Sequence, residues 1–301
     1  MTQSPDTITA PARRLAAALE PFAGQVYFAP ECHKAYEKLG FGPSPATVGA
    51  TQMPDRPAYF CSRGSCLGQV PGEVAAATFA VFNPAVVVPA VEDGWTKTDA
   101  ATIARTRTDA STAHLTRVLG AAPAGLDRAT ELLRSATEHL RPAGRALYSG
   151  LVALGVPGTP VGDAWRLADM LREYRGDAHI AAWSSAGFDA PEIGLLTELY
   201  WGLPMRTYIR TRSWSDADLD AAEERLRSRG LVAGGALTPV GREQREQVEV
   251  ATDRQCAPIV DALGEGLDEL VGILRPWGDT LRQAGGYPAG GPHDLAASVK
   301  R

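Results

Sequence analysis

The sequence predicts a mainly α-helical fold with few, short strands, in which two similar halves pack about a pseudo-twofold axis. Three observations support this prediction. Apolar residues recur at helical spacing along most of the 301 residues. Segments rich in glycine and proline separate these stretches. Short motifs also recur in the same order in both halves. Hydrophobic residues make up 45% of the chain and charged residues 22%, a globular composition that excludes wholesale disorder, collagen and coiled coils.

Helices are expected wherever the apolar spacing or a run of strong helix formers persists. The expected helices cover residues 15–22, 73–82, 99–118, 127–140, 143–154, 163–174, 180–185, 191–201, 216–229, 242–263 and 267–274. The longest apolar stretch, residues 74–91, contains Pro84 and Pro89 and is interpreted as a buried helix followed by an extended piece rather than a membrane span.

Loops are expected between these helices. Residues 42–57 form a polar loop rich in glycine and proline, residues 121–125 a turn, and residues 156–162 the boundary between the two halves. The tail at 285–301, with six glycines and prolines in its first eight residues, is expected to be loosely held.

Two tryptophan motifs of the form W-[ST]-x-x-D indicate an internal duplication. The first is WTKTD at 95–99 and the second is WSDAD at 214–218. Each predicts a helix start, in which Thr96 or Ser215 caps the free N–H groups and the following aspartate favours the positive end of the helix dipole.

A second pair of motifs supports the duplication. HKAY at 33–36 leads to Gly40-Phe41, and HIAAW at 179–183 leads to Gly187-Phe188, so each predicts a helix that ends at glycine. Segments 126–154 and 241–274 also correspond. We therefore expect a first copy at 1–157 with an inserted connection at 42–70, a second copy at 158–284 and a tail at 285–301.

Residues 213–253 resemble the winged-helix part of MarR-type regulators. A capped helix ends at Gly230, a hairpin follows at Gly234-Gly235, and Thr238 precedes a long helix. The chain as a whole resembles a tandem helix-turn-helix family common in actinobacteria. This resemblance implies two winged-helix-like copies and, for a regulator, a recognition helix at 216–229 in the DNA major groove.

The charges of that helix oppose DNA contact, because it carries five acidic residues against three arginines and the hairpin has no cation. A compact basic run remains as the DNA-binding alternative. It consists of Arg206, Arg210 and Arg212.

Histidines paired with carboxylates are the candidate catalytic groups. Glu31 precedes His33 by two residues, and Asp177 precedes His179 by the same spacing. A carboxylate can orient an imidazole for acid–base work or metal ligation. If the copies face each other, both pairs line one cleft, where they bind a small polar ligand or a divalent metal such as zinc or iron. The alternative is that each pair only secures a helix start.

The ligand-binding candidates surround this expected cleft. Arg63 and Arg175 neutralise an anionic ligand, Tyr36 supplies a hydroxyl, and Asn83, Tyr148 and Trp183 are candidate walls. Tyr200 and Trp201 are further candidate walls. Each aromatic residue has the alternative of simple core packing. The four cysteines have neither redox nor zinc spacing and are expected to be reduced thiols.

The composition directs the functional expectation. A net charge of −5 gives no overall field that attracts nucleic acid, and the N-terminus lacks a signal-peptide apolar core. The sequence therefore predicts a cytoplasmic small-molecule-binding protein, monomeric or homodimeric, without a membrane partner. An enzyme that uses the histidines is one form of this hypothesis, and a ligand-responsive transcriptional regulator is the alternative.

Overall fold

The computed structural model describes residues 10–290, and within them helices dominate. The prediction of a mainly α-helical fold with few, short strands is confirmed. The helices are α1 (Pro11–Gly24), α2 (Pro30–Glu37), α3 (Arg56–Gly64), α4 (Gly72–Phe79), α5 (Pro84–Lys97), α6 (Ala100–Leu119), α7 (Leu126–Thr137), α8 (Ala146–Leu154), α9 (Pro160–Ser185), α10 (Ala190–Tyr200), α11 (Asp216–Ser228), α12 (Pro239–Gln255), α13 (Ala257–Leu263) and α14 (Gly266–Gln283). The short 3₁₀ turns are η2 (Gln25–Tyr27), η3 (Ser65–Leu67) and η4 (Ile209–Arg212). The antiparallel hairpins are β1 (Thr47–Val48) with β2 (Thr51–Gln52), and β3 (Val232–Ala233) with β4 (Ala236–Leu237).

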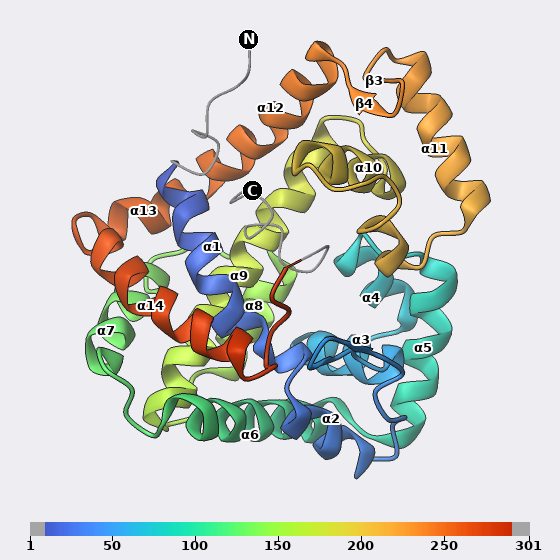
Figure 1. Ribbon diagram of the computed structural model, residues 1–301. Helices are drawn as coiled ribbons and strands as arrows, with labels where there is room; N and C mark the ends of the chain where they lie inside the picture. The colour runs from blue at the N-terminus through green and yellow to red at the C-terminus, as the bar shows by residue number, and fades with distance from the viewer. Residues whose placement is uncertain (1–9, 291–301) are drawn as a thin grey trace.

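Helix α9 is the central element of the molecule (Figure 1). It packs against α1, α6, α7, α8 and α12. Its first turn is secured by Asp163, whose carboxylate accepts hydrogen bonds from the backbone N–H groups of Gly158 and Thr159. Trp165 is fully buried, and its Nε1 donates to the carbonyl of Ala23 in α1 at 3.1 Å. Helices from both halves of the chain therefore pack against α9.

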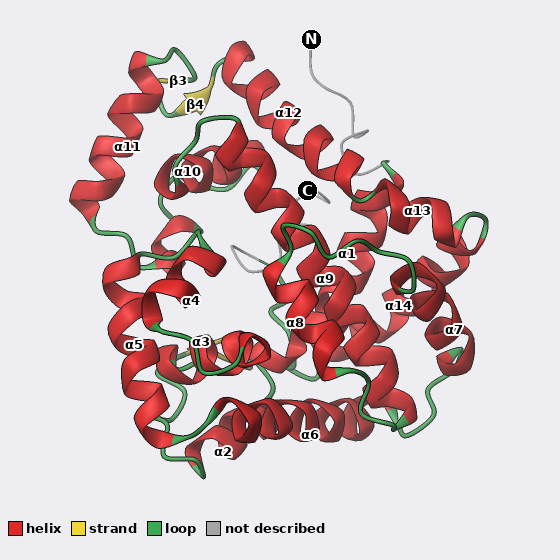
Figure 2. Ribbon diagram, turned by 180° about the vertical axis from the view of Figure 1, so that it is seen from behind, coloured by secondary structure: helices red, strands yellow, loops and turns green. Residues whose placement is uncertain are grey.

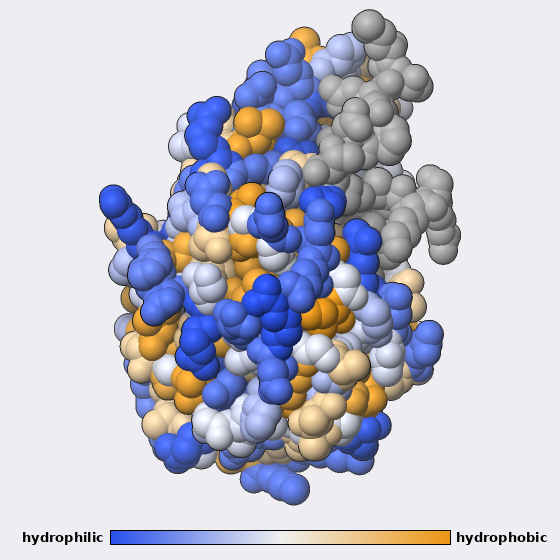
Figure 3. All heavy atoms as spheres, turned by 90° about the vertical axis from the view of Figure 1, so that its left-hand side faces the viewer, coloured by the Kyte–Doolittle hydropathy of each residue, from blue (hydrophilic) through white to orange (hydrophobic). Residues whose placement is uncertain are grey.

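The buried apolar side chains form three clusters. The largest lies around α1, α6, α7, α9 and α14, a second around α10, α11 and the β3–β4 hairpin, and a third around α3, α4 and α5. Figure 2 shows α10, α11 and α12 at one end of the molecule and α6 at the other. On the face over α7, α13 and α14, charged and apolar side chains are interspersed (Figure 3).

The second half has the local structure that its sequence predicts. Ser215 caps α11 in a capping box with Asp218, and Thr238 caps α12 through the N–H of Gly241. Gly234 and Gly235 both have positive φ, which suits the tight turn between β3 and β4. The helix, hairpin and helix order expected at 213–253 is thus present.

The first tryptophan motif differs from the expectation. Trp95 and Thr96 lie in the last turns of α5, and α6 begins after Asp99, whose carboxylate accepts from the N–H of Thr102. Thr96 is therefore not a helix cap. The two tryptophans consequently occupy different places relative to their helices, because Trp214 stands just before α11.

The second pair of motifs matches in detail. Gly40 and Gly187 both have positive φ at the ends of α2 and α9. Behind each glycine a buried phenylalanine donates its N–H to the carbonyl five residues earlier, Phe41 to Tyr36 and Phe188 to Trp183. This is a Schellman helix end in both places. The duplication itself stays a prediction, and this pair supports it.

Several helix boundaries correct the sequence-based expectation. The helices expected at 163–174 and 180–185 are one continuous helix, α9, and the expected helix at 242–263 is interrupted before α13. The extended piece expected after Pro84 is helix α5, which accommodates Pro89, and α14 continues through Pro276. Helix α3 and the β1–β2 hairpin occupy much of the segment expected as an inserted loop.

The start of the expected tail packs against the body of the protein. Tyr287 is buried and its ring lies 5.3 Å from that of Phe28 in an edge-on arrangement. Loose attachment therefore does not begin at Gly285. Residues 291–301 lie outside the described part of the chain.

Replacement of Gly187 by alanine tests the matched helix ends. A side chain in the left-handed region costs about 1 kcal/mol, so Gly187→Ala and Gly40→Ala should each lower the free energy of unfolding by about that amount. The control is Gly272→Ala on the exposed face of α14, where an added Cβ meets no atom within 4 Å and the free energy should instead rise by about 0.5–1 kcal/mol. Urea unfolding measures all three. Equal effects at the three sites would contradict the assignment of Gly40 and Gly187 as left-handed residues at helix ends.

Candidate functional site

A cavity of about 980 Å³ lies among the three apolar clusters. Its lining residues belong to all of them, with Leu171 from the first, Ile193 from the second and Phe60 from the third. Helices α1 and α3 contribute wall residues from the first half of the chain, and α9, α10, η4 and α12 contribute them from the second. Residues from both halves of the chain therefore line one cavity, while a cleft between two duplicated copies stays a prediction.

One face of α9 forms part of the cavity wall. Arg172, Arg175, Gly176 and His179 follow the i, i+3, i+4, i+7 spacing of a single helical face, and all four line the cavity. Gly176 has no side chain, and a Cβ there would meet only Glu173 Oε2 at 3.5 Å. The cavity thus borders directly on the α9 backbone at this position.

Aromatic side chains from the first half form a second part of the wall. Tyr59 lies 5.0 Å from Tyr27, 5.4 Å from Phe60 and 5.6 Å from Phe82, measured between ring centroids. All four residues line the cavity. Tilted and edge-on contacts of this kind favour flat apolar groups of a ligand.

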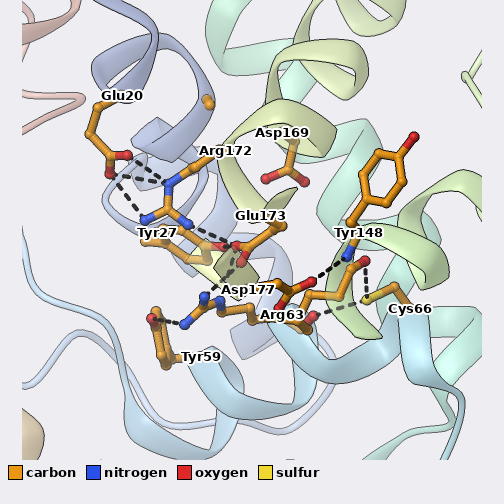
Figure 4. Close-up of polar contacts among 12 residues, drawn as sticks. Glu20, Tyr27, Tyr59, Arg63, Cys66, Tyr148, Asp169, Arg172, Glu173 and Asp177 are labelled. Carbon is orange, nitrogen blue, oxygen red and sulfur yellow. Dashed lines mark hydrogen bonds and ion pairs between the residues drawn. The ribbon is translucent and has the colours of Figure 1, made fainter. Parts of the chain in front are cut away.

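A buried ionic network joins α9 to the first half (Figure 4). Glu173 accepts from Arg63 Nη2 at 2.7 Å and from Arg172 Nη1 at 2.8 Å, and Arg172 Nε also donates to Glu20 in α1. Burial alone would raise the pKa of Glu173, but the charges of Arg63 and Arg172 lower it to about 2. Glu173 therefore stays ionised, and Arg63, a predicted ligand-binding residue, is engaged by it while bordering the cavity.

A second ionic cluster lies where α9 meets α12. Glu249 accepts from Arg245 Nη2 at 2.7 Å and from Arg175 Nη2 at 2.8 Å. Arg245 is almost completely buried, and its guanidinium group lies 4.9 Å from the centre of the Tyr200 ring. Arg175 was predicted to bind a ligand. It borders the cavity together with Arg245 and Glu249.

His179 lies in the same wall in a neutral state. Burial lowers its pKa to about 3. Its Nδ1 is 3.1 Å from Thr252 Oγ1, and that hydroxyl donates to the carbonyl of Val248. Nδ1 therefore carries the proton and Nε2 is left as an acceptor. Asp177 does not orient this ring, since it accepts from the backbone N–H of Tyr148 instead.

His33 does not share the cavity with His179. It is buried in α2 and meets the backbone of Gln52, and it is absent from the cavity lining. Glu31 pairs with His114 at 2.7 Å and with Arg117, and not with His33. Burial would raise the pKa of Glu31, but these hydrogen bonds lower it to about 2. The expected meeting of two histidine–carboxylate pairs is thus wrong.

Four other predicted ligand-binding residues lie outside the cavity lining. Tyr36 and Trp183 are buried in the apolar core, and the Tyr148 hydroxyl donates to the carbonyl of Thr137. Asn83 joins the halves, because its N–H donates to Arg212 O and its side-chain amide to Ser213 O. None of these four lines the cavity.

The predicted DNA-binding arginines have different surroundings. Arg206 pairs with Asp220 and Glu223, and Arg210 pairs with Asp216, all acids of α11. Arg212 instead borders the cavity, with its guanidinium group 4.7 Å from the Phe82 ring centre and 4.5 Å from that of Tyr208. One member of the basic run thus belongs to the cavity wall.

No metal-binding group is apparent in residues 10–290, where no three His, Cys, Asp or Glu side chains are placed to hold an ion. The thiols of Cys32, Cys61, Cys66 and Cys256 are unpaired with one another. In the same part of the chain, no helix is long and apolar enough to cross a membrane.

Comparison with known proteins identifies the family from a match that covers residues 12–288. The chain belongs to a helix-turn-helix family. No curated protein and no solved structure matches the chain. Family membership agrees with the α10, α11 and β3–β4 arrangement of the second half.

Sequence reasoning missed the residues that surround the predicted ones. Tyr27, Arg172, Glu173, Gly176 and Arg245 were not singled out. Helical spacing back from His179 identifies Arg175, Gly176 and Arg172, provided that α9 is treated as one helix. Arg245 carries no such signal, since its role depends on the contact between α9 and α12.

Asp177 should destabilise the fold at neutral pH. Burial raises its pKa to about 6, and the hydrogen bond from the N–H of Tyr148 and the charges of Arg63 and Arg145 offset this only in part. An acid whose pKa is higher in the folded state costs stability above that pKa, and the cost disappears as the pH falls toward the unfolded value. Asp177→Asn keeps the acceptor and removes the charge. It should raise the free energy of unfolding by up to about 3 kcal/mol near pH 7.5 and by much less at about pH 4.

Urea unfolding at both pH values measures this difference. The exposed Asp261→Asn is the matched control and should change little at either pH. A loss of stability in Asp177→Asn at neutral pH would show that the ionised carboxylate is favoured where it lies.

Proposed function

We propose that this protein binds a small organic molecule in the central cavity. The observation that carries the proposal is the cavity of about 980 Å³, which falls in the size range of ligand sites. Its lining combines aromatic rings with a few fixed polar groups, as ligand pockets do. The wall comes from both halves of the chain, so a bound molecule would bridge them.

The α9 face would orient such a molecule. Neutral His179 offers an acceptor at Nε2, and Thr197 of α10 adds a hydroxyl to the same lining. A histidine with a pKa of about 3 is a weak base near neutral pH. This favours a role of His179 in hydrogen bonding to the ligand over proton abstraction, and a binding protein over an acid–base enzyme.

Filling the cavity at Gly176 tests the proposal. Wild-type protein should bind the neutral fluorescent probe pyrenebutanol at one equivalent. Gly176→Phe places a ring in the cavity and should weaken binding by about tenfold or more, which corresponds to about 1.4 kcal/mol. The matched control, Gly272→Phe on exposed α14, should bind as the wild type does. Fluorescence titration measures the three affinities, and circular dichroism checks the fold.

Equal affinity in Gly176→Phe, or binding at many equivalents, would mean that the probe adheres to the surface. The cavity would then have no support as a binding site.

A second candidate function is a ligand-responsive DNA-binding regulator. The family match and the helix–hairpin arrangement at α11 favour it. In that function α11 would enter the major groove. The acids of α11 oppose this. Asp216, Asp220 and Glu223 pair with Arg206 and Arg210, so these arginines are already neutralised and offer little charge to DNA phosphates.

A gel-shift titration distinguishes the two functions. With a pool of genomic fragments at about 50 mM salt we expect no retained complex, since the paired arginines offer few charges to phosphate. A complex that weakens with salt and is lost in the Arg206→Gln, Arg210→Gln double variant would instead establish the regulator.

A further inference from the structure

We propose that the ligand is an organic anion, an apolar and partly aromatic molecule with one carboxylate-type group, and that Arg245 binds that group. This inference rests on the proposed function of the cavity and specifies the chemical class of its ligand. It is carried by the donors that Arg245 leaves unpaired, by the distribution of nearby acids and by the composition of the opposite wall.

Arg245 is a buried cation whose hydrogen bonding is incomplete. Its side chain is 1% exposed, and its Nη2 donates to Glu249. Its Nε and Nη1 are buried and have no acceptor among the described residues. Leaving buried donors unpaired is costly, and more so on a charged group. Since Arg245 lines the cavity, an acceptor supplied by a ligand would complete its bonding.

The neighbouring carboxylates are already in use. Glu249 is shared between Arg245 and Arg175, and the charges of these arginines lower its pKa despite burial. Asp253 accepts from Arg13 Nε and lies 3.7 Å from Arg175. Glu246 also pairs with Arg13, at 2.8 Å.

Arg175 repeats the pattern, because its Nε is buried and has no acceptor in the described structure. Two guanidinium groups that border one cavity thus share Glu249, and Asp253, the second carboxylate near Arg175, is also paired with Arg13.

Arg245 is held in a fixed orientation. The Tyr200 ring lies on one side of its guanidinium group, and Glu249, one helical turn along α12, holds Nη2. A cation fixed in this way loses little conformational entropy when an anion binds. The site therefore has the properties of a preformed anion subsite.

The remainder of the wall defines the rest of the ligand. The Tyr27, Tyr59, Phe60 and Phe82 rings suit an aromatic or apolar body. Arg212 adds a further positive charge between Phe82 and Tyr208, and no carboxylate pairs with it among residues 10–290. Arginines outnumber acidic residues in the lining, and this excess together with the apolar surface favours an organic anion over a cationic or highly hydrophilic ligand.

The experiment compares two probes that differ in one group. Pyrenebutyrate has a carboxylate where pyrenebutanol has a hydroxyl, and both are fluorescent. Wild-type protein should bind pyrenebutyrate at one equivalent and about tenfold or more tightly than pyrenebutanol. Arg245→Met should abolish this preference and leave the affinity for pyrenebutanol nearly unchanged. Arg245→Lys, which keeps the charge, should retain part of it.

A buried arginine that does not line the cavity provides the matched control. Arg166 is 3% exposed and also has an unpaired Nε, so Arg166→Met imposes a similar change elsewhere in the core and should keep the preference. If Arg245→Met does not fold, the ratio of the affinities for pyrenebutyrate and pyrenebutanol, measured in the wild type and in Arg245→Lys, still tests the anion subsite.

The outcomes separate the two proposals. Wild-type protein that binds both probes equally well, or keeps its preference in Arg245→Met, would overturn the anion subsite and leave the cavity as a ligand site. If Gly176→Phe does not weaken the binding of either probe, or if the wild type binds neither, the proposed function is overturned and this inference with it.

Discussion

The buried pairing of Glu173 with Arg63 and Arg172 is the interaction on which the rest of this structure depends. The Arg63–Glu173 pair holds α3 against the middle of α9, and Arg172 extends the network to Glu20 of α1, at the edge of the cavity. Ions in a protein interior require partners, and removal of one partner leaves an uncompensated charge at a cost of several kcal/mol. The pairing therefore fixes where the first half rests on α9, and thereby where the walls of the cavity stand. Apolar packing alone would favour closure of this space.

The charge arrangement around α11 supports the proposed binding function over the alternative of a DNA-binding regulator. The acids of α11 neutralise Arg206 and Arg210, and Arg212 lies between two aromatic rings at the cavity. Basic groups that would face phosphate in a regulator thus face acids or the interior. Asn83 and Trp214, which bond the two halves through backbone carbonyls, hold this arrangement together. Arg206 and Arg210 thus make their ionic contacts within the chain.

Local sequence rules predicted the local structure well. The Ser215 and Thr238 caps, the glycine hairpin and the two Schellman ends are determined by a few adjacent residues, and all are present. The continuity of α9 was missed because the Asp177–His179 pair was considered as the start of a separate helix, whereas packing on several sides stabilises one helix through Gly176. The pairing of His33 with His179 failed for a different reason. It assumed that similar motifs in two halves face each other, and only tertiary packing decides which residues meet.

The position of a bound probe in the crystal tests the central claim, that the halves enclose a ligand site against α9. The account predicts electron density for the pyrene rings of pyrenebutyrate between the α9 face at Gly176 and the aromatic wall at Tyr59 and Phe82, with the carboxylate at Arg245. A structure in which side chains fill this space, with the probe absent or bound at the outer surface, would contradict it.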